Sequence, residues 1–173
     1  MARVYLSIGS NIQRQHYISR CLDRLYGEFG ELLISSIYES EAVGFDAEPF
    51  FNLVTGLDTD LSLSDLYRRL RAIEHDNGRD INALKFSSRT LDIDILTYDD
   101  YVGSFEGGRL PREDITKNAF VLWPMAELEP NSLHPEEKIS YHQLWQAFDR
   151  SQQVLRPVPF IWRGRQLSAL AES

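Results

Sequence analysis

The sequence has 173 residues, of which 43% are hydrophobic, and its formal net charge is −8. This length and apolar fraction predict a single domain, 1–173, whose core needs neither disulfides nor metal for stability. The acidic balance argues against binding of nucleic-acid backbones, which requires a basic surface. The single cysteine, Cys21, permits no internal disulfide and favours a cytoplasmic location. No apolar run reaches the ~18 residues of a membrane span.

Apolar periodicity in the first part of the chain predicts alternating strands and helices. A helix is expected between a cap at Ser62 or Ser64 and a stop at Gly78. An earlier helix is expected after a cap at Ser10 or Asn11. The earlier helix spans 12–28 and follows a strand at 3–9. Two further strands are expected at 32–40 and 50–60, with a loop at 41–49 between them. After the second helix come a polar loop at 80–88 and a strand at 89–97.

The predicted order, β-α-β-β-α-β, is that of the ferredoxin-like split βαβ unit, an α+β fold. It gives one antiparallel sheet with two helices on one face. Residues 98–173 contain a glycine-rich acidic loop, the apolar run AFVLWPMAEL, a predicted helix in SYHQLWQAFDR and a possible strand pair in VPFIWRGRQL. No linker separates this extension, so we expect it to cover the other face of the sheet within the same domain.

Two carboxylates, Asp92 and Asp94, interrupt the apolar strand RTLDIDIL. Side chains alternate along a strand, so both project from one face, roughly 6–7 Å apart. Their mutual repulsion raises the pKa of one of them unless a cation lies between them. Hard oxygen ligands on a rigid element suit Mg²⁺, and two such ions assist phosphoryl transfer. The alternative is an edge strand whose charges face solvent and block aggregation.

Polar residues near this strand suggest what else the site holds. Arg79 and Arg89 offer bidentate donors to phosphate, with Glu74 one helical turn before Arg79; each could instead be a surface charge. Asn52 is unusual inside an apolar strand. With Phe50 on the same face it could form a slot for a flat heterocycle, or it could be a structural residue bonded to a loop.

Four segments, IGSN, E-x-x-x-G-R, RTLDIDIL and FVLWPMAELEP, resemble in order and spacing the 6-hydroxymethyl-7,8-dihydropterin pyrophosphokinase family. The resemblance extends from about residue 3 to residue 150. It implies the ferredoxin-like fold and a pterin pocket beside an ATP site with two Mg²⁺ ions. It also implies transfer of pyrophosphate from ATP to the pterin hydroxymethyl group, giving AMP and the pterin diphosphate in folate biosynthesis.

The resemblance assigns roles by position. It implies that Asp92 and Asp94 are the Mg²⁺ ligands and, with Arg89, the catalytic residues. The implied ATP-binding residues are Glu74, Arg79, Phe86, Arg89, Ile95 and Arg112. The implied pterin-binding residues are Ser40, Val43, Phe50, Asn52 and Phe120.

Several positions depart from the family pattern. Ile81 and Asn118 stand where arginines are usual, Arg112 replaces a histidine, Phe86 a tryptophan and Arg71 a glutamine. The first hypothesis is therefore an ATP- and Mg²⁺-dependent pyrophosphokinase that acts as a monomer on small molecules, without nucleic acid or membrane. One alternative is a diverged pterin-binding paralogue with weak, absent or altered-substrate activity. Another is a ferredoxin-like binding module without chemistry.

Overall fold

The computed structural model describes residues 1–40, 49–78, 90–151 and 153–169. Its elements in chain order are β1 (Ala2–Ser10), α1 (Arg14–Phe29), β2 (Leu33–Ile34), β3 (Ile37–Ser40), β4 (Phe50–Thr59), α2 (Leu63–Asp76), β5 (Asp92–Tyr98), β6 (Gly103–Phe105), β7 (Gly108–Leu110), α3 (Asp114–Lys117), α4 (Ala119–Leu128), α5 (Tyr141–Ala147), β8 (Arg156–Val158), β9 (Ile161–Trp162) and β10 (Arg165–Gln166).

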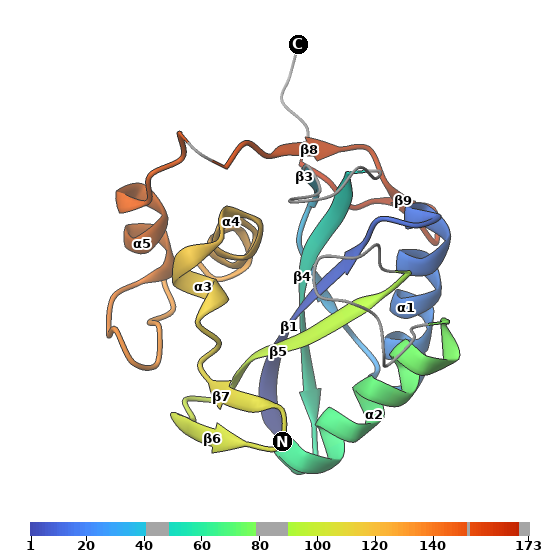
Figure 1. Ribbon diagram of the computed structural model, residues 1–173, viewed down its shortest axis with the longest axis horizontal. Coiled ribbons are helices and arrows are strands. Elements are labelled where there is room, and N and C mark those ends of the chain that lie inside the picture. Colours follow the sequence, from blue (N-terminus) through green and yellow to red (C-terminus); the bar gives the residue numbers. More distant parts are fainter. Residues whose placement is uncertain (41–48, 79–89, 152, 170–173) are drawn as a thin grey trace.

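One antiparallel sheet organises the molecule (Figure 1). Its strand order is β5-β1-β4-β3-β8, and β2 pairs with β4 beside β3. With β2 and β3 taken as one interrupted strand, β1 to β5 follow the ferredoxin-like order, so the predicted fold class is confirmed. The expected antiparallel pairing of the strands at 32–40 and 50–60 is confirmed as well.

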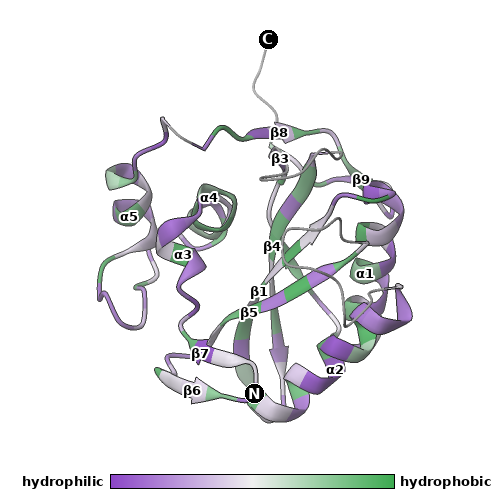
Figure 2. Ribbon diagram, in the orientation of Figure 1, coloured by the Kyte–Doolittle hydropathy of each residue, from purple (hydrophilic) through white to green (hydrophobic). Residues whose placement is uncertain are grey.

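Helices cover both faces of this sheet. Helices α1 and α2 lie on one face, and α3, α4 and α5 lie on the other (Figure 1). Val4, Leu6 and Ile8 of β1 pack in the core on the α1 side, whereas Tyr5 packs with α4. The alternation of side chains along β1 explains this division. Figure 2 shows α4 as a largely hydrophobic helix beside the sheet, as expected for a segment that covers the second face.

The predicted cap of the first helix is wrong. Ser10 belongs to β1, where it pairs with Phe51 of β4, so the strand extends one residue past its predicted end at Gly9. Helix α1 begins at Arg14 after Gln13, whose φ of 43° is left-handed, and no side chain caps it. Asn11 therefore does not act as the helix cap either.

The strand predicted at 32–40 is interrupted in the middle. The Ser36 amide donates to the Glu127 carboxylate of α4, 3.0 Å away, instead of pairing along the sheet. The Ser36 hydroxyl donates to the same carboxylate at 2.7 Å. A charged acceptor on the covering helix therefore splits the predicted strand into β2 and β3.

The C-terminal extension contains more structure than its sequence indicated. The glycine-rich loop includes the β6–β7 hairpin, and VPFIWRGRQL forms the expected strand pair, β9 with β10. β8 was not expected, and it pairs with β3 to extend the main sheet. Among the described residues, none of the helices is long and apolar enough to cross a bilayer.

The start of α2 provides a test of the fold. Ser62 Oγ accepts the Asp65 amide hydrogen at 3.2 Å, whereas Ser64 lies inside the helix. We expect Ser62→Ala to lower the free energy of unfolding by about 1 kcal/mol, because an N-cap hydrogen bond is lost. Ser64→Ala should change it by less than about 0.5 kcal/mol, because alanine suits a helix interior. Urea denaturation of both variants measures the difference, and equal effects would contradict the assigned cap.

Candidate active site

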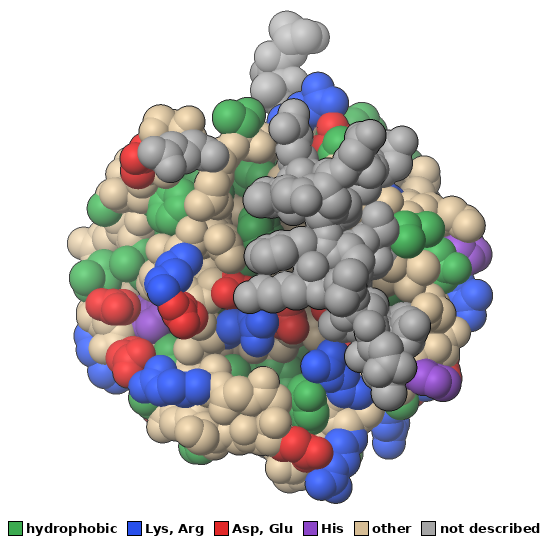
Figure 3. Space-filling view, viewed as in Figure 1, with side chains coloured by type: hydrophobic (Ala, Val, Ile, Leu, Met, Phe, Trp, Pro, Cys, Tyr) green, Lys and Arg blue, Asp and Glu red, His purple; other side chains and the backbone are tan. Residues whose placement is uncertain are grey.

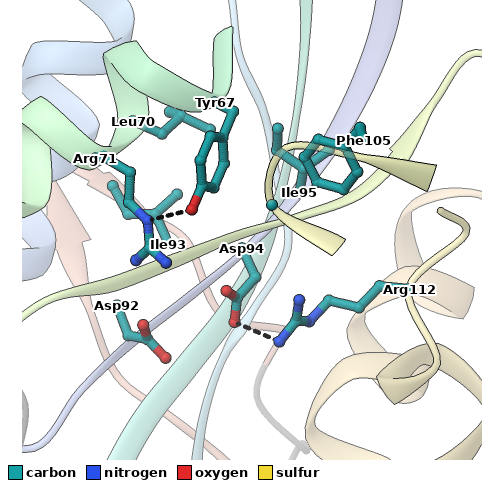
Figure 4. A pocket seen from close by; sticks show the side chains of 10 residues that line it. Tyr67, Leu70, Arg71, Asp92, Ile93, Asp94, Ile95, Phe105 and Arg112 are labelled. Carbon is teal, nitrogen blue, oxygen red and sulfur yellow. Dashed lines mark hydrogen bonds and ion pairs between the residues drawn. The ribbon is translucent and has the colours of Figure 1, made fainter. Parts of the chain in front are cut away.

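A cleft of about 210 Å³ opens between α2, β5 and the β6–β7 hairpin (Figure 4). Both aspartates of β5 line it. The lining residues are Tyr67, Leu70, Arg71, Asp92, Ile93, Asp94, Ile95, Phe105, Gly107 and Arg112. The cleft thus brings the acidic pair together with two arginines and an aromatic wall.

Small residues of β1 flank the two aspartates. In the pairing of β1 with β5, Gly9 is opposite Asp92 and Ser7 is opposite Asp94. All four lie on the face of the sheet that α4 covers elsewhere, because side chains alternate along both strands. A large side chain on β1 would fill the space over the carboxylates. Gly9 and Ser7 are both small, a feature that the prediction of a strand at 3–9 did not connect with the two aspartates.

The carboxylate of Asp94 lies close both to the negative Asp92 and to the positive Arg112. Burial and, next, the negative charge of Asp92 raise the pKa of Asp94 to about 7, although Arg112 acts in the opposite direction. The direction agrees with the expectation that repulsion raises the pKa of one aspartate, but burial is the larger cause. Arg112 Nη2 lies 3.7 Å from Asp94 Oδ2, and its Nε donates to Asp114 at 3.1 Å. Figure 3 shows acidic and basic side chains side by side on this face.

A second arginine, Arg71, lies across the aspartate pair from Arg112 (Figure 4). Its Nε donates to the Tyr67 hydroxyl at 3.0 Å and its Nη1 to Glu74 at 2.7 Å, while 46% of the side chain stays exposed. These two bonds fix the guanidinium at the edge of the cleft. Tyr67 has no special sequence signal, because it follows the ordinary spacing of an amphipathic helix.

Glu74 lies beneath the acidic strand. Only 1% of the residue is exposed, and its carboxylate accepts the Ile93 amide hydrogen at 2.8 Å as well as Arg71. This bond joins α2 to β5 between Asp92 and Asp94. Glu74 therefore helps to fix the strand from which both carboxylates project.

A row of residues crosses four strands beside the cleft. Gly9 pairs with Asp92 on one side and with Asn52 on the other, and Asn52 pairs with Tyr38. Asn52 Nδ2 donates to Ser40 Oγ at 2.8 Å, and the residue is 5% exposed. Two strand spacings, about 10 Å, therefore separate Asp92 from Asn52 on one face. Among the described residues, the hydrogen-bond partner of Asn52 lies on the neighbouring strand β3, and most of the loop considered from the sequence, 41–48, lies outside them.

The remaining predicted residues fall into two groups. Phe50, beside Ser40 in the pairing of β3 with β4, and Phe120 of α4 are both partly exposed, whereas Ile95 is 5% exposed and lines the cleft from below. The other predicted residues, Val43, Arg79, Phe86 and Arg89, lie outside the described residues, as does Ile81.

The acidic pair fits a divalent cation. Its donors are hard carboxylate oxygens, and burial together with the negative charge of Asp92 raises the pKa of Asp94, so a cation here would favour the charged carboxylate. Within the described ranges, no group of three or more His, Cys, Asp or Glu could hold a metal. The other ligands of a cation bound here would be waters and ligand oxygens, which is the coordination that Mg²⁺ favours.

A family model and several named proteins match this chain over most of its length. Residues 5–130 match the family model described as 7,8-dihydro-6-hydroxymethylpterin-pyrophosphokinase (HPPK). A protein of Aquifex aeolicus named 2-amino-4-hydroxy-6-hydroxymethyldihydropteridine pyrophosphokinase is 38% identical over 138 residues, which cover 78% of this chain and 85% of that protein. A protein of the same name from Porphyromonas gingivalis is 38% identical over 143 residues, covering 79% and 96%.

Solved structures show the same fold at lower sequence identity. The crystal structure of wild-type Plasmodium falciparum HPPK-DHPS matches with a TM-score of 0.63 at 13% identity. The match covers 84% of this chain but only 44% of that chain, so the present chain spans less than half of its length. This likeness concerns the arrangement of strands and helices alone.

The raised pKa of Asp94 predicts how pH affects the metal-free protein. Because the folded pKa of about 7 exceeds the ordinary value of 3.8, the unfolded chain loses this proton first. Stability therefore falls as pH rises from about 4 to 7 and stays lower above that range. Asp94→Asn removes the loss, so in EDTA at pH 8 we expect it to raise the free energy of unfolding by about 1–2 kcal/mol.

Denaturant titrations of both proteins at pH 5 and pH 8 measure this effect. Adding Mg²⁺ at pH 8 should stabilise the wild type and leave Asp94→Asn nearly unchanged, because the variant lacks one carboxylate ligand. Equal pH dependence of the two metal-free proteins would contradict the raised pKa.

Gly9 provides a second test of the site. A Cβ at this position would lie 2.9 Å from Asn52 Oδ1, so Gly9→Ala should turn the amide away from Ser40. We expect a loss of about 1 kcal/mol in stability from the broken hydrogen bond, with the displaced amide visible in a crystal structure. Gly27→Ala is the control, because nothing lies within 4 Å of its Cβ and alanine favours the helix. An unmoved Asn52 in Gly9→Ala would refute the contact.

Proposed function

The chain belongs to the 7,8-dihydro-6-hydroxymethylpterin-pyrophosphokinase family, and from the geometry of the site we propose which of its residues carry out the family's reaction. This reaction is the transfer of pyrophosphate from ATP to 6-hydroxymethyl-7,8-dihydropterin in folate biosynthesis, with ATP as co-substrate. The observation that carries the residue assignment is the row on one sheet face that joins Asp92, through Gly9, to Asn52.

The acidic pair is the proposed metal site. Asp92 and Asp94 would hold two Mg²⁺ ions, which supply positive charge to the triphosphate when bound. Support comes from the hard oxygen donors and from the raised pKa of Asp94. Glu74 has a supporting role, because its bond to the Ile93 amide fixes the strand between the two carboxylates.

Arginines at two edges of the cleft are the proposed phosphate ligands. Arg112 and Arg71 flank the aspartates from opposite sides, and a guanidinium can bind phosphate oxygens with two parallel hydrogen bonds. They supply positive charge near a site whose family pattern has further arginines where Ile81 and Asn118 stand. Arg89 remains a proposed catalytic residue from its sequence position.

The proposed pterin pocket lies beside Asn52. The side-chain amide offers both a donor and an acceptor to the edge of a flat heterocycle, and Ser40 holds the amide in place. Phe50 and Phe120 are proposed to stack against the ring. The separation of about 10 Å between Asn52 and Asp92 leaves room for a bicyclic ring whose hydroxymethyl arm points toward the aspartates.

In this arrangement the pterin hydroxymethyl oxygen forms a bond to the β-phosphorus of ATP. The bond from that phosphorus to the oxygen bridging to the α-phosphorus breaks, AMP leaves, and the hydroxyl proton is released. The rigid strands hold the two substrates in reacting orientation. Arg112 and Arg89 are proposed to stabilise the negative charge that develops on the transferred group.

Other assignments stay proposals from the sequence. Arg79, Phe86 and Ile95 are proposed to bind ATP, and Val43 is proposed to contact the pterin. We also propose that the chain acts as a cytoplasmic monomer on small molecules without nucleic acid or membrane, which its net charge of −8 supports in part. The comparisons give no support to a diverged pterin-binding paralogue without this activity.

The acidic pair can be tested by activity. With ATP, Mg²⁺ and 6-hydroxymethyl-7,8-dihydropterin, we expect Asp92→Asn and Asp94→Asn to reduce AMP formation at least about a hundredfold, because charge stabilisation of the triphosphate is lost. Asp100→Asn is the matched control, since Asp100 lies in the exposed turn after β5, and it should keep full activity. Wild-type turnover in either site variant would refute the metal assignment.

A further inference from the structure

The last part of the chain wraps around strand β3. We call residues 153–169 the C-terminal arm; it lies beyond residue 130, where the family match ends. The arm contains β8, β9 and β10, and Figure 1 shows it passing from α5 across the edge of the sheet toward α1. Its place at the sheet edge raises the question of what it does for the site.

Three sets of contacts attach the arm to β3 and β4. β8 pairs with β3 from Ile37 to Glu39. The Ile37 amide donates to Ser168 Oγ at 2.9 Å, and the buried ring of Phe160 packs edge-to-face on Phe51 with centroids 6.4 Å apart. A strand of four residues with an open edge frays easily. Within the described residues, the arm supplies the strand that pairs with the outer edge of β3.

A charged cluster at the end of β3 joins the arm to α1. Glu39 accepts a hydrogen bond from Arg156 of the arm at 2.7 Å and one from Arg14 of α1 at 2.9 Å. Both bonds lower the pKa of Glu39, that from Arg156 more. Arg14 also donates to the Pro49 carbonyl at 2.9 Å and lies over the Phe51 ring. The cluster thus links the end of β3 to the beginning of β4.

The end of β3 also contacts Asn52, on the face of the sheet opposite Glu39. Ser40 follows Glu39 directly, and its Oγ accepts the hydrogen bond from Asn52 Nδ2. Since alternate residues of a strand face opposite sides, Glu39 points toward α1 while Ser40 points toward Asn52. Any shift of the backbone at Glu39 moves Ser40 and changes the orientation of the Asn52 amide.

We propose that the C-terminal arm is a positioning element for pterin recognition, which acts through the contact of Arg156 with Glu39 on the Ser40–Asn52 pair. This inference rests on the proposed role of Asn52 in binding the pterin. Neither Arg156 nor Glu39 touches a substrate. Their contribution is to keep the Asn52 amide in the orientation that the ring requires, so they affect the pterin and not ATP.

The test is steady-state kinetics of Arg156→Gln. We expect the KM for 6-hydroxymethyl-7,8-dihydropterin to rise about two- to fivefold, because 74% of the Arg156 side chain is exposed and such pairs are weak. The KM for ATP and kcat should stay within about twofold, and Tm within about 2 °C. A purely structural role would lower Tm without separating the two KM values.

The matched control is Arg163→Gln. Arg163 lies in the same arm, but its guanidinium donates to Asp23 of α1 at 3.0 Å and lies over the Tyr26 ring of the same helix, so these contacts go to α1 and not to Glu39. This variant should keep both KM values. An equal rise in the pterin KM for Arg156→Gln and Arg163→Gln would overturn the inference, as would an equal rise in both KM values for Arg156→Gln.

A double-mutant cycle tests the route through Glu39. Glu39→Gln should raise the pterin KM, and adding Arg156→Gln should change it little further, because the two residues share one contact. Fully additive effects would overturn the route. Asn52→Ala distinguishes failure of the proposed pterin site from failure of the proposed role of the arm. An unchanged pterin KM in this variant would refute both. A raised KM in Asn52→Ala but not in Arg156→Gln would refute the inference alone.

Discussion

Strand β1 lies between β5 and β4, and its residue Gly9, which has no side chain, separates Asp92 of β5 from Asn52 of β4. The backbone pairing fixes the spacing of Asp92 and Asn52 on either side of Gly9. A Cβ there would lie 2.9 Å from Asn52 Oδ1. The metal side and the pterin side of the proposed site therefore share one central backbone position, and the distance between them is set by strand spacing.

The site is built at some cost in stability. Burial of Asp94 and, next, repulsion from Asp92 on the same strand face raise the pKa of Asp94. Arg112 offsets only part of this effect, and the negative charge of Glu74 adds to it. A protein optimised for folding alone would not keep this charge. The arrangement is understandable if positive charge arrives with the substrate, because binding then neutralises the negative charge that the folded protein leaves uncompensated.

Alternation and helical periodicity sufficed to predict the order of strands and helices along the chain and the common face of Asp92 and Asp94, because both follow from backbone geometry. Local patterns could not reveal the break at Ser36, which depends on Glu127 some ninety residues away, or the pairing of β8 with β3. They placed Gly9 at the end of a strand but could not reveal its position between Asp92 and Asn52, which depends on the two partner strands. The treatment of 1–173 as one domain remains a prediction, which the β8 pairing supports.

Strand β8 also determines where the sheet stops. It has three residues, and its middle residue is Pro157, which has no amide hydrogen to offer to another strand. Arg156 adds a charge at the same edge. Short length, proline and charge are the features that prevent one sheet from pairing with another. The arm that extends the sheet by one strand thus also closes it, and this side of the molecule resists growth into larger aggregates.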